Sequence, residues 1–138
     1  MALFCHFPTP TINKTHQGYA IACEAKAGRY PIGSKAVGQV RNLFEKIKRA
    51  FPDYLVHKII VSRSKVGYDS SGKDQAPPEV VHVSHKILLS LLEEQESRLE
   101  KGSSLITPVH FMIALKEFIR EQRLEPTTSE FLEKIHAI

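Results

Sequence analysis

Residues 19–63, YAIACEAKAGRYPIGSKAVGQVRNLFEKIKRAFPDYLVHKIIVSR, contain the pattern that decides the fold. Side chains alternate over residues 19–27 as in a half-buried strand, one side of which carries Tyr19, Ile21, Cys23 and Ala25. Apolar residues at spacings of three and four predict an amphipathic helix over residues 35–50, and they are Val37, Val40, Phe44, Ile47 and, just beyond, Phe51. Residues 54–63 are rich in β-branched side chains and predict a second strand. The stretch therefore predicts a strand–helix–strand unit.

The chain after this unit is predicted to be mainly helical. Residues 64–78 are rich in glycine, serine and proline, and they predict a loop long enough to be functional or mobile. Residues 79–84 alternate, so they are either a short strand or the start of a helix that ends at Gly102. Thr107 is the predicted N-cap of a second helix, and Thr128 or Ser129 is the predicted N-cap of a third.

These patterns predict an α+β fold with a small sheet, in which the strand–helix–strand unit (19–63) packs on a C-terminal three-helix region. A length of 138 residues fits a single domain, 1–138, with an α/β front part at about 1–63 and a helical part at about 79–138. The candidate core residues are Phe44 and Ile47 in the front part and Leu88, Leu92, Met112 and Ile119 in the helical part.

The two cysteines lead to a separate prediction about the N-terminal segment. If residues 2–7 form a strand that folds back onto residues 19–27, the turn is centred near residues 13–15, and Cys5 and Cys23 lie roughly opposite each other. Pro8 and Pro10 argue against a regular hairpin. Two cysteines outside any CxxC pair, no signal-peptide pattern and no apolar run of about 20 residues predict a cytoplasmic protein that makes no contact with a membrane.

Charge is distributed unevenly along the chain. Residues 1–76 hold 12 Lys and Arg against 5 Asp and Glu, whereas residues 77–138 hold 7 against 10. Lys35, Asn42, Lys46 and Arg49 share one face of the first predicted helix, Arg41 and Lys48 flank that face, and Tyr68 stands among the cations of the long loop. Cations on one surface bind phosphates, and an aromatic ring stacks on single-stranded bases. The candidate nucleic-acid-binding residues are therefore Lys35, Arg41, Lys46, Lys48, Arg49, Arg63, Lys65, Tyr68 and Lys73; the alternative is an ordinary solvated face.

The segment GRYPIGSK, residues 28–35, follows a predicted strand and opens a predicted helix, which is the context of a P-loop. A P-loop has lysine before serine, but here Ser34 precedes Lys35, which turns the lysine by about 100° around the helix. Nucleotide hydrolysis is therefore not expected. Gly33, Ser34 and Lys35 remain candidates for holding a phosphate group at a helix N-terminus.

No arrangement of residues predicts catalysis. Glu79, His82 and His85 stand three residues apart, a spacing that seldom lets three side chains of one helix converge on one metal ion. GxSxG and HExxH motifs are absent. We therefore expect a non-enzymatic binding protein with no cofactor and no metal, nucleic-acid-associated through RNA or DNA. The alternatives are a protein–protein adaptor, inhibitor or chaperone that uses the C-terminal helices, and a small phosphate-ligand-binding protein or enzyme.

Overall fold

The structure is a computed structural model that describes residues 2–6, 18–27, 34–63 and 79–138. Their elements in chain order are β1 (Ala2–His6), β2 (Gly18–Lys26), α1 (Ser34–Ala50), β3 (Tyr54–Ser62), β4 (Val80–Ser84), α2 (His85–Lys101), α3 (Pro108–Arg120) and α4 (Thr128–His136). The α+β class with a C-terminal helical region is confirmed. The predicted strand–helix–strand unit is present as β2, α1 and β3, with each boundary within one residue of its prediction.

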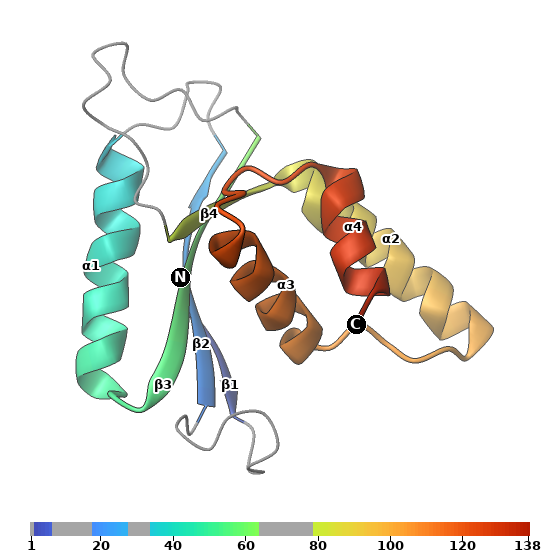
Figure 1. The fold of residues 1–138 in the computed structure, drawn as a ribbon, viewed down its shortest axis with the longest axis horizontal. Coiled ribbons are helices and arrows are strands. Elements are labelled where there is room, and N and C mark those ends of the chain that lie inside the picture. The colour runs from blue at the N-terminus through green and yellow to red at the C-terminus, as the bar shows by residue number, and fades with distance from the viewer. Residues whose placement is uncertain (1, 7–17, 28–33, 64–78) are drawn as a thin grey trace.

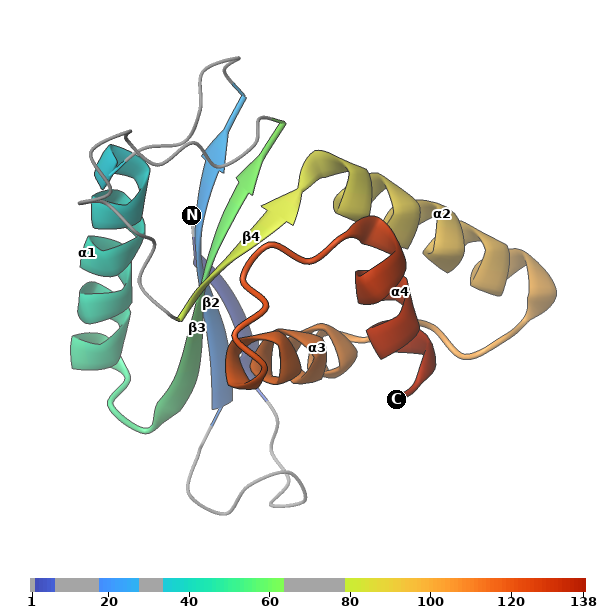
Figure 2. The same ribbon diagram turned by 45° about the horizontal axis from the view of Figure 1, so that its top comes forward.

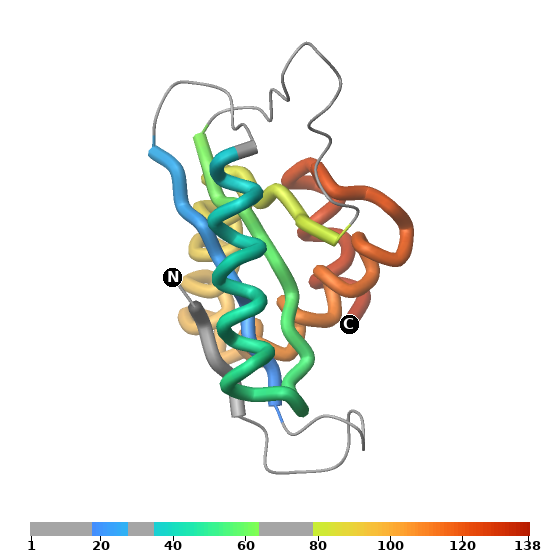
Figure 3. The backbone as a smooth tube through the Cα atoms, turned by 90° about the vertical axis from the view of Figure 1, so that its left-hand side faces the viewer, coloured from blue at the N-terminus to red at the C-terminus, as the bar shows by residue number. Residues whose placement is uncertain are grey.

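The four strands form one mixed sheet in the order β1-β2-β3-β4. β1 pairs antiparallel with β2, whereas β2, β3 and β4 are parallel. Helix α1 covers one face of the sheet, and α2, α3 and α4 lie on the other (Figures 1 and 3). β2 is therefore buried on both faces over its first six residues, so the prediction of a half-buried strand is wrong. Strands flanked by helices on both sides lose the alternation of exposed and buried positions.

The face under α1 has its own apolar core. Ala20 and Ala22 of β2 are small and let the helix approach closely, and Val37, Val40 and Ile47 of α1 are buried against them. Phe44 is only half-buried and packs against this core from its margin, so its prediction as a core residue is corrected. Phe51 lies just after α1 and is exposed, because the helix ends at Ala50 before the apolar spacing does.

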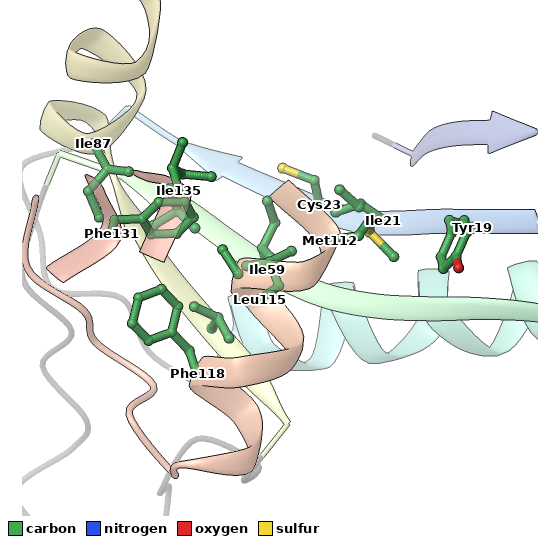
Figure 4. Close-up of a cluster of buried hydrophobic side chains, with 13 residues drawn as sticks. Tyr19, Ile21, Cys23, Ile59, Ile87, Met112, Leu115, Phe118, Phe131 and Ile135 are labelled. Carbon is green, nitrogen blue, oxygen red and sulfur yellow. The ribbon is translucent and has the colours of Figure 1, made fainter. Parts of the chain in front are cut away.

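The second core lies between the sheet and the three C-terminal helices (Figure 4). Phe118 of α3 and Phe131 of α4 are fully buried, with their ring centroids 5.3 Å apart. Met112 is buried as predicted, whereas the predicted core residues Leu88 and Ile119 are only partly buried at its margin. Apolar side chains from the helices and the strands thus meet in one cluster, which holds the helical part on the sheet.

The prediction that Leu92 is a core residue is wrong. Leu92 is 66% exposed and Leu99 63% exposed, because α2 is rotated about its axis relative to the predicted register. The side that faces inward begins with Ile87, which is buried, and continues through Leu91 to Glu94, whose carboxylate contacts His136 of α4 at 3.0 Å. In Figure 2 the C-terminal half of α2 projects beyond α4.

Residues 80–84 form a strand, which answers the question that their alternation left open. Ser84 ends β4 and caps α2, since its hydroxyl accepts a hydrogen bond from the Ile87 backbone N–H at 3.4 Å. The outer edge of β4 is partly covered, because the His82 backbone N–H donates to the Leu124 carbonyl oxygen at 2.7 Å. Such cover removes part of an open edge on which another chain could pair.

The N-terminal hairpin is confirmed as the pair β1–β2, but its register is not the one that the cysteines suggested. Cys5 lies opposite Tyr19, so Cys23 stands four residues further along β2. Four strand residues span about 14 Å, about twice the Cα separation that a disulfide allows. The predicted opposition of the two cysteines is therefore wrong, and the predicted turn near residues 13–15 lies outside the described residues.

Candidate nucleic-acid interface

The exposed side of α1 is basic. The buried side is set by the apolar residues that pack on β2 and β3, so the opposite arc of the helix faces solvent. Lys35, Arg41, Lys46 and Arg49 lie on this arc and are exposed. Lys35 and Arg49 are 14 residues apart, which corresponds to about 21 Å along a helix. We call these four residues the α1 basic face.

The four cations of the α1 basic face have no ion-pair partner among the residues that the structure describes. Glu45 is the one carboxylate within the helix itself. Elsewhere, four cations of the helical part do have carboxylate partners, in the pairs Arg98–Glu94, Arg120–Glu117, Arg123–Glu130 and Lys134–Glu121. Lys86, Lys101 and Lys116 are unpaired within the same described part of the chain, but they are spread over α2 and α3. Cations without an ion-pair partner in the described part of the chain thus concentrate on α1, although Glu45 stands one turn from both Arg41 and Arg49.

Lys48, a candidate from the sequence, makes contacts within the protein. Its side chain is half-buried, and Nζ donates hydrogen bonds to the carbonyl oxygens of Tyr54 at 2.8 Å and Pro52 at 3.3 Å. The charge therefore ties the C-terminal end of α1 to the start of β3. Since the sequence shows only a lysine on the flank of the basic face, this contact was not predictable from spacing.

The remaining predicted residues lie at the other end of α1 or outside the description. Arg63 follows β3 and is exposed at the carboxyl edge of the parallel strands, the edge near which α1 begins (Figure 3). At that edge Lys26 pairs with Glu24 at 3.2 Å. Ser34 is the first residue of α1. The predicted residues Gly33, Lys65, Tyr68 and Lys73 lie outside the described residues, so the phosphate-binding site predicted at residues 33–35 is described only in part.

A polar pair that sequence reasoning missed joins β3 to β4. Ser62 Oγ lies 2.7 Å from His82 Nε2, and Ser62 is buried. Burial lowers the pKa of His82, which keeps the imidazole neutral near pH 7 and able to accept the hydroxyl proton. A neutral histidine beside serine is one component of a nucleophilic site. However, the buried position of Ser62 closes it to a substrate, and the pair serves to link neighbouring strands.

Two other features of the described residues offer no site. No group of three His, Cys, Asp or Glu side chains in residues 2–6, 18–27, 34–63 and 79–138 is placed to hold a metal ion. A hollow of about 330 Å³ lies between α3 and α4, but most of its charged side chains pair with one another, Lys134 with Glu121 and Arg123 with Glu130. It therefore offers a ligand few unsatisfied groups.

Among the described residues no helix is both long and apolar enough to cross a membrane. Comparison with protein-family models, with curated proteins and with solved structures found no match to this chain.

Proposed function

We propose that this protein binds nucleic acid, RNA or DNA, through the α1 basic face. The observation that supports the proposal is the set of four exposed cations along one side of a single helix, without carboxylate partners among the described residues. Each cation that meets a phosphate releases condensed counterions, which is the main source of affinity in non-specific binding. Arg63 is exposed at the edge of the sheet near which α1 begins, and we include it as a further candidate contact.

The rigidity of α1 favours this function. The helix is packed on the sheet over its length, and Lys48 anchors its C-terminal end through two backbone carbonyls. A duplex carries one phosphate charge per about 1.7 Å of axis, so a basic stretch of about 21 Å faces several phosphates at once. No aromatic side chain among the described residues is exposed on the α1 basic face. The proposed contacts of this face are therefore with the phosphate backbone of the nucleic acid, and they carry little information about base sequence.

The test is a binding titration with labelled single-stranded and duplex RNA and DNA at several salt concentrations. The double variant Lys46→Glu with Arg49→Glu should weaken binding at low salt by at least about tenfold, about 1.4 kcal/mol. The variant should also make the plot of log K against log salt shallower, with the magnitude of its slope reduced by about two, because two phosphate contacts are lost. Both residues are exposed, so the melting temperature should stay close to that of wild type.

The matched control is Lys101→Glu with Lys116→Glu, which removes two exposed, unpaired lysines of the described helical part and makes the same change in net charge. If the α1 basic face is the interface, the control keeps most of the affinity. Equal losses in the two double variants would mean that net charge alone is responsible. Wild-type protein that binds none of the probes at low salt would end the proposal.

A further inference from the structure

Helix α2 carries a row of exposed leucines on its outer side. Leu89 is 54% exposed, and with Leu92, Glu96 and Leu99 it follows spacings of three, four and three. This is the repeat by which one helix lies along another, with leucine at three of the four positions. α2 contacts β4 and α4 and lies at the outside of the molecule (Figure 2), and all four residues of the row are exposed. We call Leu89, Leu92, Glu96 and Leu99 the α2 stripe.

We propose that the α2 stripe is a self-association surface on which a second copy of this chain docks its own α2 in antiparallel orientation. An exposed apolar row on a helix is stabilised when a second apolar row covers it. The charges beside the stripe identify the occupant and the direction. The inference does not rest on nucleic-acid binding, because α1 and α2 lie on opposite faces of the sheet (Figure 1).

One flank of the α2 stripe carries three exposed charges at intervals of seven residues, namely Lys86, Glu93 and Glu100. Residues seven apart on a helix lie nearly above one another, so the three form a straight line beside the leucines. In a parallel pair this line would face the other flank of the second copy, which carries Leu88 and Gln95, so the three charges would meet no opposite charge there. The charges of this flank therefore contribute no attractive contact to a parallel pair of equal register.

In an antiparallel pair centred near Glu93, Lys86 of each copy faces Glu100 of the other, which gives two attractive contacts. Glu93 then faces Glu93 of the other copy, which gives one repulsive contact. In the same register Leu89 lies beside the second copy's Leu99, and Leu92 lies beside the aliphatic stem of Glu96. Two ion pairs against one like-charge contact favour this arrangement. The flank is thus self-complementary in the antiparallel direction alone.

The interface is small, so the association is of the weak, transient class. Sedimentation of the untagged chain without nucleic acid, from about 10 µM to about 1 mM, should show a monomer–dimer equilibrium. Leu92→Glu should raise the dissociation constant at least about tenfold, because it places a charge in the apolar row. Ile138→Glu is the matched control, since Ile138 is an exposed apolar residue outside α2 and its variant should dimerise like wild type.

Charge reversal gives the sharper experiment. Lys86→Glu alone places two repulsive contacts in the dimer, and so does Glu100→Lys alone, so each variant should dimerise more weakly than wild type. A mixture of the two variants should form a heterodimer of wild-type strength. In that heterodimer each substituted side chain faces one of opposite charge, and the unchanged Glu100 of one copy faces the unchanged Lys86 of the other. Glu93→Gln should strengthen the wild-type dimer by removing the like-charge contact.

Several results would overturn the proposal. A chain that stays monomeric at about 1 mM has no usable stripe–stripe contact, and the stripe then serves a different partner. A dimer that Leu92→Glu leaves unchanged uses another surface. A mixture of the two charge-reversal variants that associates no better than either alone contradicts the antiparallel pairing. Circular dichroism and thermal melting of each variant establish that the fold is intact, which exposed positions should allow.

Discussion

The Lys58 ammonium group lies 4.1 Å from the centroid of the Phe44 ring, so β3 and α1 meet through a cation–π contact on the buried face of the sheet. Lys58 is 7% exposed, and its Nζ atom also lies 3.3 Å from Oε1 of Glu79, the residue just before β4. A lysine that is buried must keep partners for its charge. This contact explains why Phe44 remains at the margin of its core rather than inside it.

The Lys58–Glu79 pair predicts a non-additive response to mutation. Glu79→Gln leaves a buried ammonium without its carboxylate and should lower the free energy of unfolding by about 1–2 kcal/mol, a value reduced from that of a fully buried pair because Glu79 is half exposed. Lys58→Met keeps an apolar contact with Phe44 and should make the Glu79→Gln change nearly neutral. Urea denaturation of the two single variants and the double variant measures this coupling. Additive losses would mean that the pair contributes nothing.

A second prediction concerns the stability of the fold at acidic pH. Burial, together with the nearby charges of Lys116 and Lys58, lowers the pKa of His57 from 6.5 to about 4. His57 Nε2 has no hydrogen-bond partner among the described residues. The unfolded chain binds a proton at this histidine at a higher pH than the folded chain does. The contribution of neutral His57 to the free energy of unfolding is therefore fully present above pH 6.5 and is lost as the pH falls towards 4.

The loss attributable to His57 should reach about 3 kcal/mol at pH 4, since each pKa unit corresponds to about 1.4 kcal/mol. His57→Leu removes the titrating group and keeps an apolar side chain on that face of β3. Denaturant melts at about pH 7 and about pH 4.5 should therefore show a smaller pH effect in the variant than in wild type. The same pH dependence in both proteins would assign acid sensitivity to other groups.

Truncation of two apolar helix residues, Phe118 and Leu92, should have very different effects on the free energy of unfolding. Phe118 is fully buried between α3 and α4, so Phe118→Ala should lower the free energy of unfolding by about 3–5 kcal/mol. Leu92 is exposed on α2, so Leu92→Ala should change it by less than about 0.5 kcal/mol. Both are measured by denaturation at low protein concentration, where the proposed dimer is absent. A large loss for Leu92→Ala would place that residue in a core.

The cysteines supply a chemical prediction. Cys5 faces Tyr19 across the hairpin, four residues from the position opposite Cys23, so mild oxidation should not form an intramolecular disulfide. Burial raises the pKa of the Cys23 thiol, which lowers its thiolate fraction. Cys23 should therefore react slowly with iodoacetamide until the protein is unfolded. Mass spectrometry of native protein after oxidation and alkylation tests both expectations, and an intramolecular crosslink would contradict the register.

The sequence by itself determined the strand–helix–strand unit and the order of the helices after it. Alternation along residues 19–27 and the spacing of Val37, Val40 and Ile47 are local patterns, and they reflect the repeats of a strand and a helix whatever the surroundings. Capping residues likewise act on the chain next to them, and Thr107 does cap α3, although the cap of α4 is Thr127 rather than the predicted Thr128 or Ser129. The basic side of α1 followed from the same period, because the apolar stripe fixes which side faces solvent.

The tertiary structure alone decided which faces are covered. Leu92 and Leu99 resemble core residues in the sequence, but α2 packs through Ile87, Leu91 and the Glu94–His136 contact, and this choice depends on where α4 lies. The burial of Lys58 and its approach to Glu79 likewise require β3 and β4 to be neighbours in the sheet. Pairing between segments distant in the chain leaves no periodic mark on either segment, because both halves of such a contact are set by packing that neither contains.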